Sequence, residues 1–195
     1  YNLGMTWSGE CLFFRYLSAS ADVYYNKAED KIVASPNMYV WSMVNLGEVE
    51  SKGLDLNLQG DIPFSTDMAI VIASNYSYQH AVDVTNPEAK NYRHQIQYTP
   101  RHSGSASVMF ENLLVNIAYS LSAVGDRYML PQNIDDNRID GYVEQNISLN
   151  KSFSIGKTKL RLQGELLNLG NVTYDIIKFY PMPGRSWRIS ATLNI

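Results

Sequence analysis

The last ten residues of the chain alternate strictly between apolar and polar side chains. The apolar positions are Trp187, Ile189, Ala191, Leu193 and Ile195. Because successive side chains of a strand point to opposite faces, this pattern predicts a β-strand with one apolar and one polar face. A slip of one residue in the pairing of this strand would put every apolar side chain on the polar side. The fold must therefore contain a β-strand that is apolar on one face and polar on the other.

The same period of two recurs upstream and predicts nine strands. They are expected at about residues 1–8, 12–27, 44–60, 67–79, 101–111, 113–127, 140–153, 157–169 and 184–195. Tight turns are expected near residues 9, 62, 111 and 155, and long connections at 28–43, 80–100, 128–139 and 170–183. Short and long connections therefore alternate. No linker divides the chain, so residues 1–195 are expected to form one unit.

Strand length and turn pattern favour an antiparallel transmembrane β-barrel over a soluble β-sandwich. Several expected strands have 10–16 residues, whereas strands of globular proteins have a mode of about 5–6. A tilted strand crosses a bilayer with about 9–11 residues. Short inner turns and long outer loops are typical of outer-membrane barrels. Aromatic residues also gather near strand ends, as rings at a lipid–water interface do: Phe13, Phe14, Tyr16, Tyr24, Tyr25, Tyr76, Tyr78 and Tyr128.

Composition excludes several other classes of protein. A net charge of -3 without a basic cluster gives no basis for nucleic-acid binding. The mean hydropathy is -0.23, and no apolar run approaches the roughly 20 residues of a membrane helix. With the single cysteine Cys11, no intrachain disulfide can form. The chain begins with Tyr1 rather than Met, so we expect it to be part of a longer protein.

In a barrel, the two faces of each strand acquire different surroundings. The apolar face is expected to meet lipid, and the polar face, with Lys159, Arg161, Glu165 and Arg188, is expected to line the lumen. Backbone groups cannot stay unpaired in hydrocarbon, so the sheet must close. Single-chain bacterial barrels have an even number of strands, so nine strands imply a part of a larger barrel. The first and last strands should then pair with strands outside this chain.

Four stretches resemble landmarks of TonB-dependent receptors. Residues 166–174 resemble their N-L-x-N-x-x-Y motif, 180–188 the P-x-P-G-R lead into the final strand, 98–102 the Y-x-P-x-H strand opening, and 44–55 the N-x-G-x-x-x-x-x-G-x-E strand. Together they span residues 44–195 in the order found in the family. One departure is the last residue, which is Ile195 where the family usually has an aromatic residue.

The resemblance implies a fold and a function for the parent protein. Such receptors have a 22-stranded barrel with an N-terminal plug, and they import ferric siderophores, haem, vitamin B12 or glycans with energy from TonB. This chain would supply about nine C-terminal strands, with the C-terminus in the periplasm of a Gram-negative bacterium. Implied partners are the lipid bilayer, the plug and remaining strands, TonB through the plug, and the barrel-assembly machinery through the final strand. A surface lipoprotein is a further candidate, and no cofactor or enzyme activity is implied. The alternative is a porin-like channel or an adhesin without a plug.

The long connections carry the expected ligand-contact residues, which combine aromatic rings with a few polar groups as binding sites often do. They are Tyr39, Trp41, Tyr92, Arg93, His94, Tyr128, Tyr174 and Phe179. The alternative is that these side chains only pack the loops against one another.

Metal and catalytic sites are weaker hypotheses. His80 and His94 share one long connection, but a loop histidine is usually solvated, and no cluster has metal-ligand spacing. His102 and Ser103 are adjacent, so they point to opposite faces of a strand and cannot form a nucleophile–base pair. The acidic run 135–137 with Asp140 is compatible with calcium or, more simply, with a solvated turn. We therefore expect no metal and no catalytic residue.

The predicted apolar face has a consequence for the isolated chain. Two unpaired sheet edges and an uncovered apolar surface promote aggregation in water. Residues 1–195 expressed alone should therefore be insoluble in detergent-free buffer, which sedimentation and size-exclusion chromatography would measure. A soluble monomer in that buffer would rule out the membrane interpretation.

Overall fold

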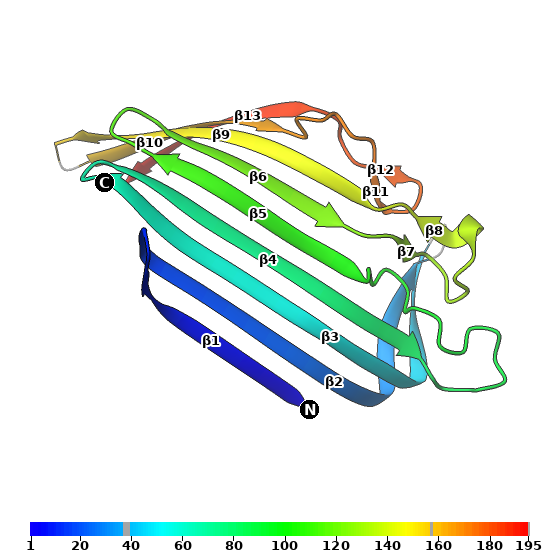
Figure 1. The fold of residues 1–195 in the computed structure, drawn as a ribbon. Helices are drawn as coiled ribbons and strands as arrows, with labels where there is room; N and C mark the ends of the chain where they lie inside the picture. The colour runs from blue at the N-terminus through cyan, green and yellow to red at the C-terminus, as the bar shows by residue number, and fades with distance from the viewer. Residues whose placement is uncertain (37–39, 157, 195) are drawn as a thin grey trace.

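One curved antiparallel sheet of nine strands makes up most of the molecule (Figure 1). The computed structural model describes residues 1–36, 40–156 and 158–194. The strands of the sheet, in order, are β1 (Asn2–Cys11), β2 (Phe14–Pro36), β3 (Trp41–Ser65), β4 (Met68–Asp83), β5 (His102–Glu111), β6 (Asn116–Val124), β9 (Tyr142–Ile155), β10 (Thr158–Leu167) and β13 (Ser186–Asn194). No helix in the described residues is long and apolar enough to cross a membrane.

Short elements lie within the long connections at one end of the sheet (Figure 1). The connection after β6 contains β7 (Arg127–Tyr128), the 3₁₀ helix η1 (Asp135–Asn137) and β8 (Arg138–Ile139). The connection after β10 contains β11 (Asp175–Ile177) and β12 (Tyr180–Pro181). Each pair of short strands forms its own two-stranded sheet, so these loops are ordered hairpins.

Tight turns and long connections occupy opposite ends of the sheet, as the sequence predicts. The tight turns directly follow the last residue pairs of neighbouring strands, such as Cys11↔Phe14 and Ser65↔Met68. At the same end, Lys159 pairs with Asn194 next to the C-terminus (Figure 1). The ordered hairpins lie at the other end. The predicted placement of the turns at the two ends is therefore confirmed. Two tight turns lie later than predicted, after Cys11 rather than near residue 9 and after Ser65 rather than near residue 62, because strand pairing continues to these residues.

Register aligns the apolar side chains of all nine strands. Residues paired directly across antiparallel strands share one face, and one such row crosses the whole sheet: Gly9, Leu17, Gly60, Ile72, Val108, Tyr119, Ile147, Leu166 and Trp187. The neighbouring row on the other face is Ser8, Ser18, Gln59, Ala73, Ser107, Ser120 and Asn146. The sheet thus has one apolar and one mainly polar surface.

The final strand follows the predicted faces. Trp187, Ile189, Ala191 and Leu193 pair in turn with apolar-face positions of β10, and Ile195 lies outside the described residues. On the opposite face, Arg188 Nε donates to Glu165 Oε2 at 2.5 Å. Trp187 is 75% exposed and Ile189 is 74% exposed. Such an apolar surface requires a covering that the described residues do not supply.

Two sequence predictions about β2 and β3 are wrong. The expected long connection 28–43 is mostly strand, since pairing continues from Glu29↔Glu48 to Pro36↔Trp41. The sequence places Tyr24 among the aromatic residues at the lipid–water interface, but in the structure it pairs with Gly53 on the polar face. The first error has a physical cause: charged residues occupy both faces beyond residue 26, so the apolar–polar alternation stops while the backbone ladder continues.

Beyond Asp30, which has a positive φ of 51°, the β2–β3 hairpin packs against the loop that follows β4. Val49, Ala81 and Ile96 form a small buried cluster there, with Val33 and Leu46 packed against it. Ile96 is held in place by its N–H, which donates to the Ala81 carbonyl at 3.0 Å. This core lies at the loop end of the sheet and orders the neighbouring connection.

The faces of β13 can be tested with a pair of arginine substitutions in the full-length parent protein. Ala191→Arg adds a charge to the apolar face, where it costs about 2–4 kcal/mol at the midplane of a bilayer. Thr192→Arg adds the same charge to the polar face. Ala191→Arg should lower the yield of heat-modifiable, protease-resistant barrel much more than Thr192→Arg. Equal yields would contradict the assignment of the two faces.

Candidate functional site

The polar face of β1–β4 is hydrogen-bonded across strands. A hollow of about 840 Å³ lies over it. Ser77 Oγ donates to Asp55 Oδ1 at 2.5 Å, and Asn75 Nδ2 donates to Ser105 Oγ at 2.7 Å. These bonds hold short polar side chains close to the sheet and leave the space above them open. Such a wall can receive a polar plug or ligand.

Gly53 explains one of the sequence landmarks. A Cβ atom at this position would lie 2.4 Å from the Tyr24 hydroxyl and 2.4 Å from the Tyr78 carbonyl oxygen. Only glycine therefore lets the Tyr24 ring lie flat against β3. Gly53, the second glycine of the stretch 44–55, thus shapes the polar wall.

The side chain of Asn168 joins the two ends of the loop that follows β10. This side chain is buried, and its Nδ2 donates to the Val172 carbonyl at 2.8 Å and to the Pro183 carbonyl at 3.3 Å. Its Oδ1 accepts from the Val172 N–H at 2.8 Å. Farther along, the Arg185 N–H donates to Asn171 Oδ1 at 2.9 Å. The N-L-x-N-x-x-Y motif of residues 166–174 thus ties the start of this loop to its end.

Arg127 connects two of the loops from a buried position. Its side chain is 4% exposed, and its Nη2 donates to the carbonyl oxygens of Asp175 at 2.5 Å and Ile176 at 3.1 Å. The guanidinium also lies 5.8 Å above the Tyr142 ring. Burial lowers the pKa of Arg127, while nearby tyrosine and aspartate side chains raise it. The cation therefore anchors β11 to β7.

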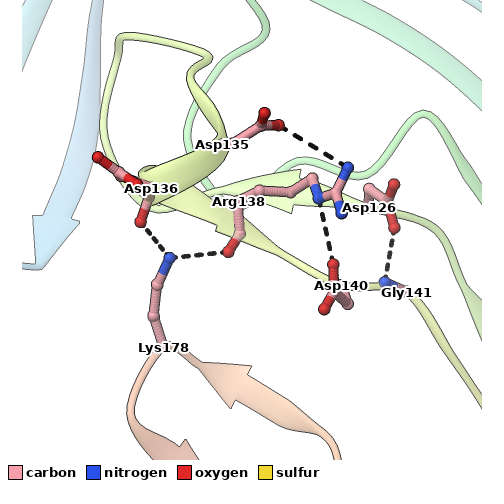
Figure 2. A network of polar contacts seen from close by, with 7 residues as sticks. All are labelled: Asp126, Asp135, Asp136, Arg138, Asp140, Gly141 and Lys178. Carbon is pink, nitrogen blue, oxygen red and sulfur yellow. Dashed lines mark hydrogen bonds and ion pairs between the residues drawn. The ribbon is translucent and has the colours of Figure 1, made fainter.

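A second cation, Lys178, reinforces this contact (Figure 2). Its Nζ donates to the carbonyl of Asp136 and, at 2.9 Å, to that of Arg138. Arg138 Nε in turn donates to Asp140 Oδ1 at 3.1 Å. The β7–β8 and β11–β12 hairpins are therefore joined by cations that bind main-chain carbonyls. Among the residues for which calcium was one interpretation, Asp135 and Asp140 pair with Arg138.

Tyr174 turns inward against the sheet. Its ring stacks on Tyr142 with centroids 3.9 Å apart, and its hydroxyl donates to Glu144. Burial raises the pKa of Tyr174, and the Glu144 carboxylate raises it further. The phenol therefore stays protonated at neutral pH and serves as a donor that fastens its loop.

His94 also contacts another loop. Its Nδ1 lies 3.2 Å from the Pro131 carbonyl oxygen and 3.2 Å from the Asn133 N–H nitrogen. Beside it, the Gln95 N–H donates to Asn133 Oδ1 at 2.6 Å, and Asn133 Nδ2 donates back to the Gln95 carbonyl at 3.2 Å. The loop after β4 is thus fastened to the loop after β6.

The other expected contact residues are dispersed. Tyr39 lies outside the described residues, and Trp41 is the first residue of β3. Tyr92 lines a small groove beside Leu46. Arg93 is exposed in the loop after β4, Tyr128 pairs with Arg138 in the β7–β8 hairpin, and Phe179 is 64% exposed beside β12. For His94 and Tyr174, the contacts seen are those of loop packing.

Three residues that organise this region were missed as site residues at the sequence level. Arg127 and Lys178 carry no local pattern that distinguishes them from solvated cations. Asn168 could have been found from the sequence, since it belongs to the N-L-x-N-x-x-Y motif in residues 166–174. Among the described residues, no group of three or more His, Cys, Asp or Glu side chains could hold a metal ion.

Comparison with known proteins decides the family. A family model described as "TonB dependent receptor-like, beta-barrel" matches residues 1–169. The chain belongs to the TonB-dependent receptor family. TonB-dependent receptors are transporters and not enzymes. No curated protein sequence matches the chain.

Solved structures have the same fold. BauA, the ferric preacinetobactin receptor from Acinetobacter baumannii, is 14% identical with a TM-score of 0.70 over 98% of this chain. FyuA, the ferric yersiniabactin uptake receptor from Yersinia pestis, is 16% identical with a TM-score of 0.58 over 99%. The copper transporter OprC is 13% identical with a TM-score of 0.63 over 95%. The chain spans 28%, 27% and 29% of these proteins, respectively, so it corresponds to part of a TonB-dependent receptor barrel.

The role of Asn168 can be tested by Asn168→Ala in the full-length receptor. The change removes the side-chain partner of the Val172 N–H and of the Val172 and Pro183 carbonyls, and a typical hydrogen bond contributes about 0.5–1.5 kcal/mol. Limited proteolysis should cut the 168–185 loop faster, while the heat-modifiable barrel still forms. Asn26→Ala, at an exposed residue of β2, is the control and should leave the cleavage rate unchanged. Unchanged cleavage in Asn168→Ala would contradict the closing role.

Proposed function

We propose that this chain forms the closing strands of an outer-membrane receptor that imports a scarce, bulky ligand with energy delivered by TonB. The observation that carries this proposal is the two-faced sheet in a chain of the TonB-dependent receptor family. Its continuous apolar face suits lipid, and its polar face suits a lumen filled by a plug. A plug in the lumen distinguishes this receptor from an open diffusion channel.

The proposed orientation puts the tight turns and the C-terminus in the periplasm and the joined hairpins outside the cell. Short periplasmic turns and long outer loops are the rule for such barrels. The partners are then the lipid bilayer, the plug with the remaining strands, and TonB acting through the plug. β13 serves the barrel-assembly machinery, and a surface lipoprotein is a candidate cover for the outer loops.

The ligand class is proposed from the loops and from the relatives. Two of the similar structures are named as receptors for ferric preacinetobactin and ferric yersiniabactin, and one as a copper transporter. A metal chelate such as a ferric siderophore is therefore the first candidate, with haem and vitamin B12 next. Phe179 and Tyr180 are 64% and 63% exposed. The neighbouring cations Arg127 and Lys178 hold their hairpin in place, so these two rings supply apolar contact on a fixed support. Tyr39, Trp41, Tyr92, Arg93, His94, Tyr128 and Tyr174 complete the proposed set.

Uptake by cells that carry the full-length receptor tests this function. Radiolabelled ferric siderophores, haem and cobalamin should be screened in cells with and without a functional TonB. At least one probe should accumulate only when both the receptor and TonB are present. Phe179→Ala with Tyr180→Ala should weaken binding of that probe to purified receptor about tenfold, or about 1.4 kcal/mol.

A matched control separates ligand contact from barrel damage. Phe64→Ala removes a ring that is 61% exposed at the tight-turn end, and it should leave binding unchanged. Uptake that persists without TonB would favour the porin-like alternative and overturn the proposal. Equal binding by the loop variant and the Phe64 control would remove Phe179 and Tyr180 from the site.

A further inference from the structure

Three connections at the loop end of the sheet have no hydrophobic core of their own. They are residues 84–101 after β4, 125–141 after β6 and 168–185 after β10. Among the described residues of these loops, Ile96 and Ile139 are the buried hydrophobic side chains. Buried polar side chains are more frequent: Gln95, Gln97, Arg127, Asn137 and Asn168. The order of the loops therefore depends on hydrogen bonds of buried polar groups more than on apolar packing.

Two glutamines of the 84–101 loop are buried against the 125–141 loop. Gln95 is 4% exposed, and its main chain exchanges hydrogen bonds with the Asn133 side chain. Gln97 is 8% exposed, and its Nε2 donates to the Met129 carbonyl at 3.0 Å. A polar group that stays buried but loses its partner costs free energy. A small separation of these two loops would therefore destabilise both of them.

Arg127 makes the equivalent connection from the 125–141 loop to the 168–185 loop. Its side chain is buried, and its Nη2 donates to the carbonyl oxygens of Asp175 and Ile176. Nη1 is buried without a hydrogen-bond partner among the described residues. If the 168–185 loop withdrew slightly, the buried cation would lose the carbonyls that compensate its charge. An uncompensated buried charge is strongly destabilising, so Arg127 ties the positions of these two loops together.

Tyr98 of the 84–101 loop lies beside both of the other loops. Its N–H donates to the Tyr128 carbonyl at 2.9 Å. Burial raises the pKa of its hydroxyl, and the nearby Lys178 main chain and Arg127 guanidinium lower it. The Tyr98 side chain thus lies next to the cation that joins the other two loops, and each loop adjoins both of the others.

We propose that the 84–101, 125–141 and 168–185 loops open and close as one cooperative unit, with Arg127 as the residue that couples them. Proteins open locally in contiguous cooperative units. Here a loop that leaves its neighbours removes the partners of buried groups on both sides, so a partly open state is disfavoured.

The unit also has a consequence for the ligand site. It keeps five of the proposed contact residues in fixed relative positions, although they belong to three loops: Tyr92, His94, Tyr128, Tyr174 and Phe179. This consequence rests on the proposed function, whereas the coupling of the loops does not.

Hydrogen–deuterium exchange of the purified full-length receptor in detergent tests the coupling, with mass spectrometry of peptides from each loop. Arg127→Met removes the bonds between the 125–141 and 168–185 loops, and Asn133→Ala removes side-chain bonds between the 84–101 and 125–141 loops. Each variant should speed exchange about tenfold in all three loops, because exchange reports the free energy of one shared opening. The decisive peptides are those to which the changed side chain makes no hydrogen bond: 86–94 for Arg127→Met and 170–183 for Asn133→Ala.

Lys90→Gln is the control, since it removes an exposed cation of the 84–101 loop and should leave exchange unchanged. All variants should first show the heat-modifiable barrel. Faster exchange that is confined to the two loops joined by the changed residue, or unchanged exchange in both variants, would overturn the coupling. Exchange is measured without transport, so shared opening in a receptor that lacks TonB-dependent uptake would refute the proposed function and leave this inference standing.

Discussion

The antiparallel hydrogen-bond ladder is the constraint on which the rest of the structure depends. Each strand by itself specifies only which of its side chains share a face. The ladder keeps paired residues on one face, so the row from Gly9 to Trp187 becomes continuous across nine strands. A slip of one residue between any two neighbours would set a polar row beside an apolar one. Correct register therefore creates both the apolar surface and the polar wall.

Beyond the ladder, order in the loops comes from side chains that bind the main chain. Arg127, Lys178 and Asn168 each donate to carbonyl oxygens of another part of the loops. Loops on a scaffold often carry function, and here side chains of the chain itself join them to one another. Phe179 can therefore remain exposed without its hairpin collapsing onto the sheet. This arrangement would lower the ordering cost of the proposed ligand binding, because the support is held in place by the chain itself.

The outward face changes its chemistry along the length of the strands. Apolar residues such as Leu54 give way to Lys52 within the same strand and on the same face. A continuous sheet can thus meet hydrocarbon, headgroup and water in succession without any change in backbone structure. The strands β2 and β3, with 23 and 25 residues, are long enough to do so.

The sequence by itself determined the nine strands, their two faces, the ends at which tight turns and long connections lie, and the family landmarks. It did so because a sheet with one apolar and one polar surface imposes a period of two on every residue of its strands. The tertiary structure alone decided that residues 28–36 extend β2, and that Tyr174 turns to Glu144 and Arg127 to β11. Beyond the apolar surface, charged residues occupy both faces of β2, so no alternation marks residues 28–36. Tyr174 and Glu144 are 30 residues apart, and local periodicity carries no information on such partners.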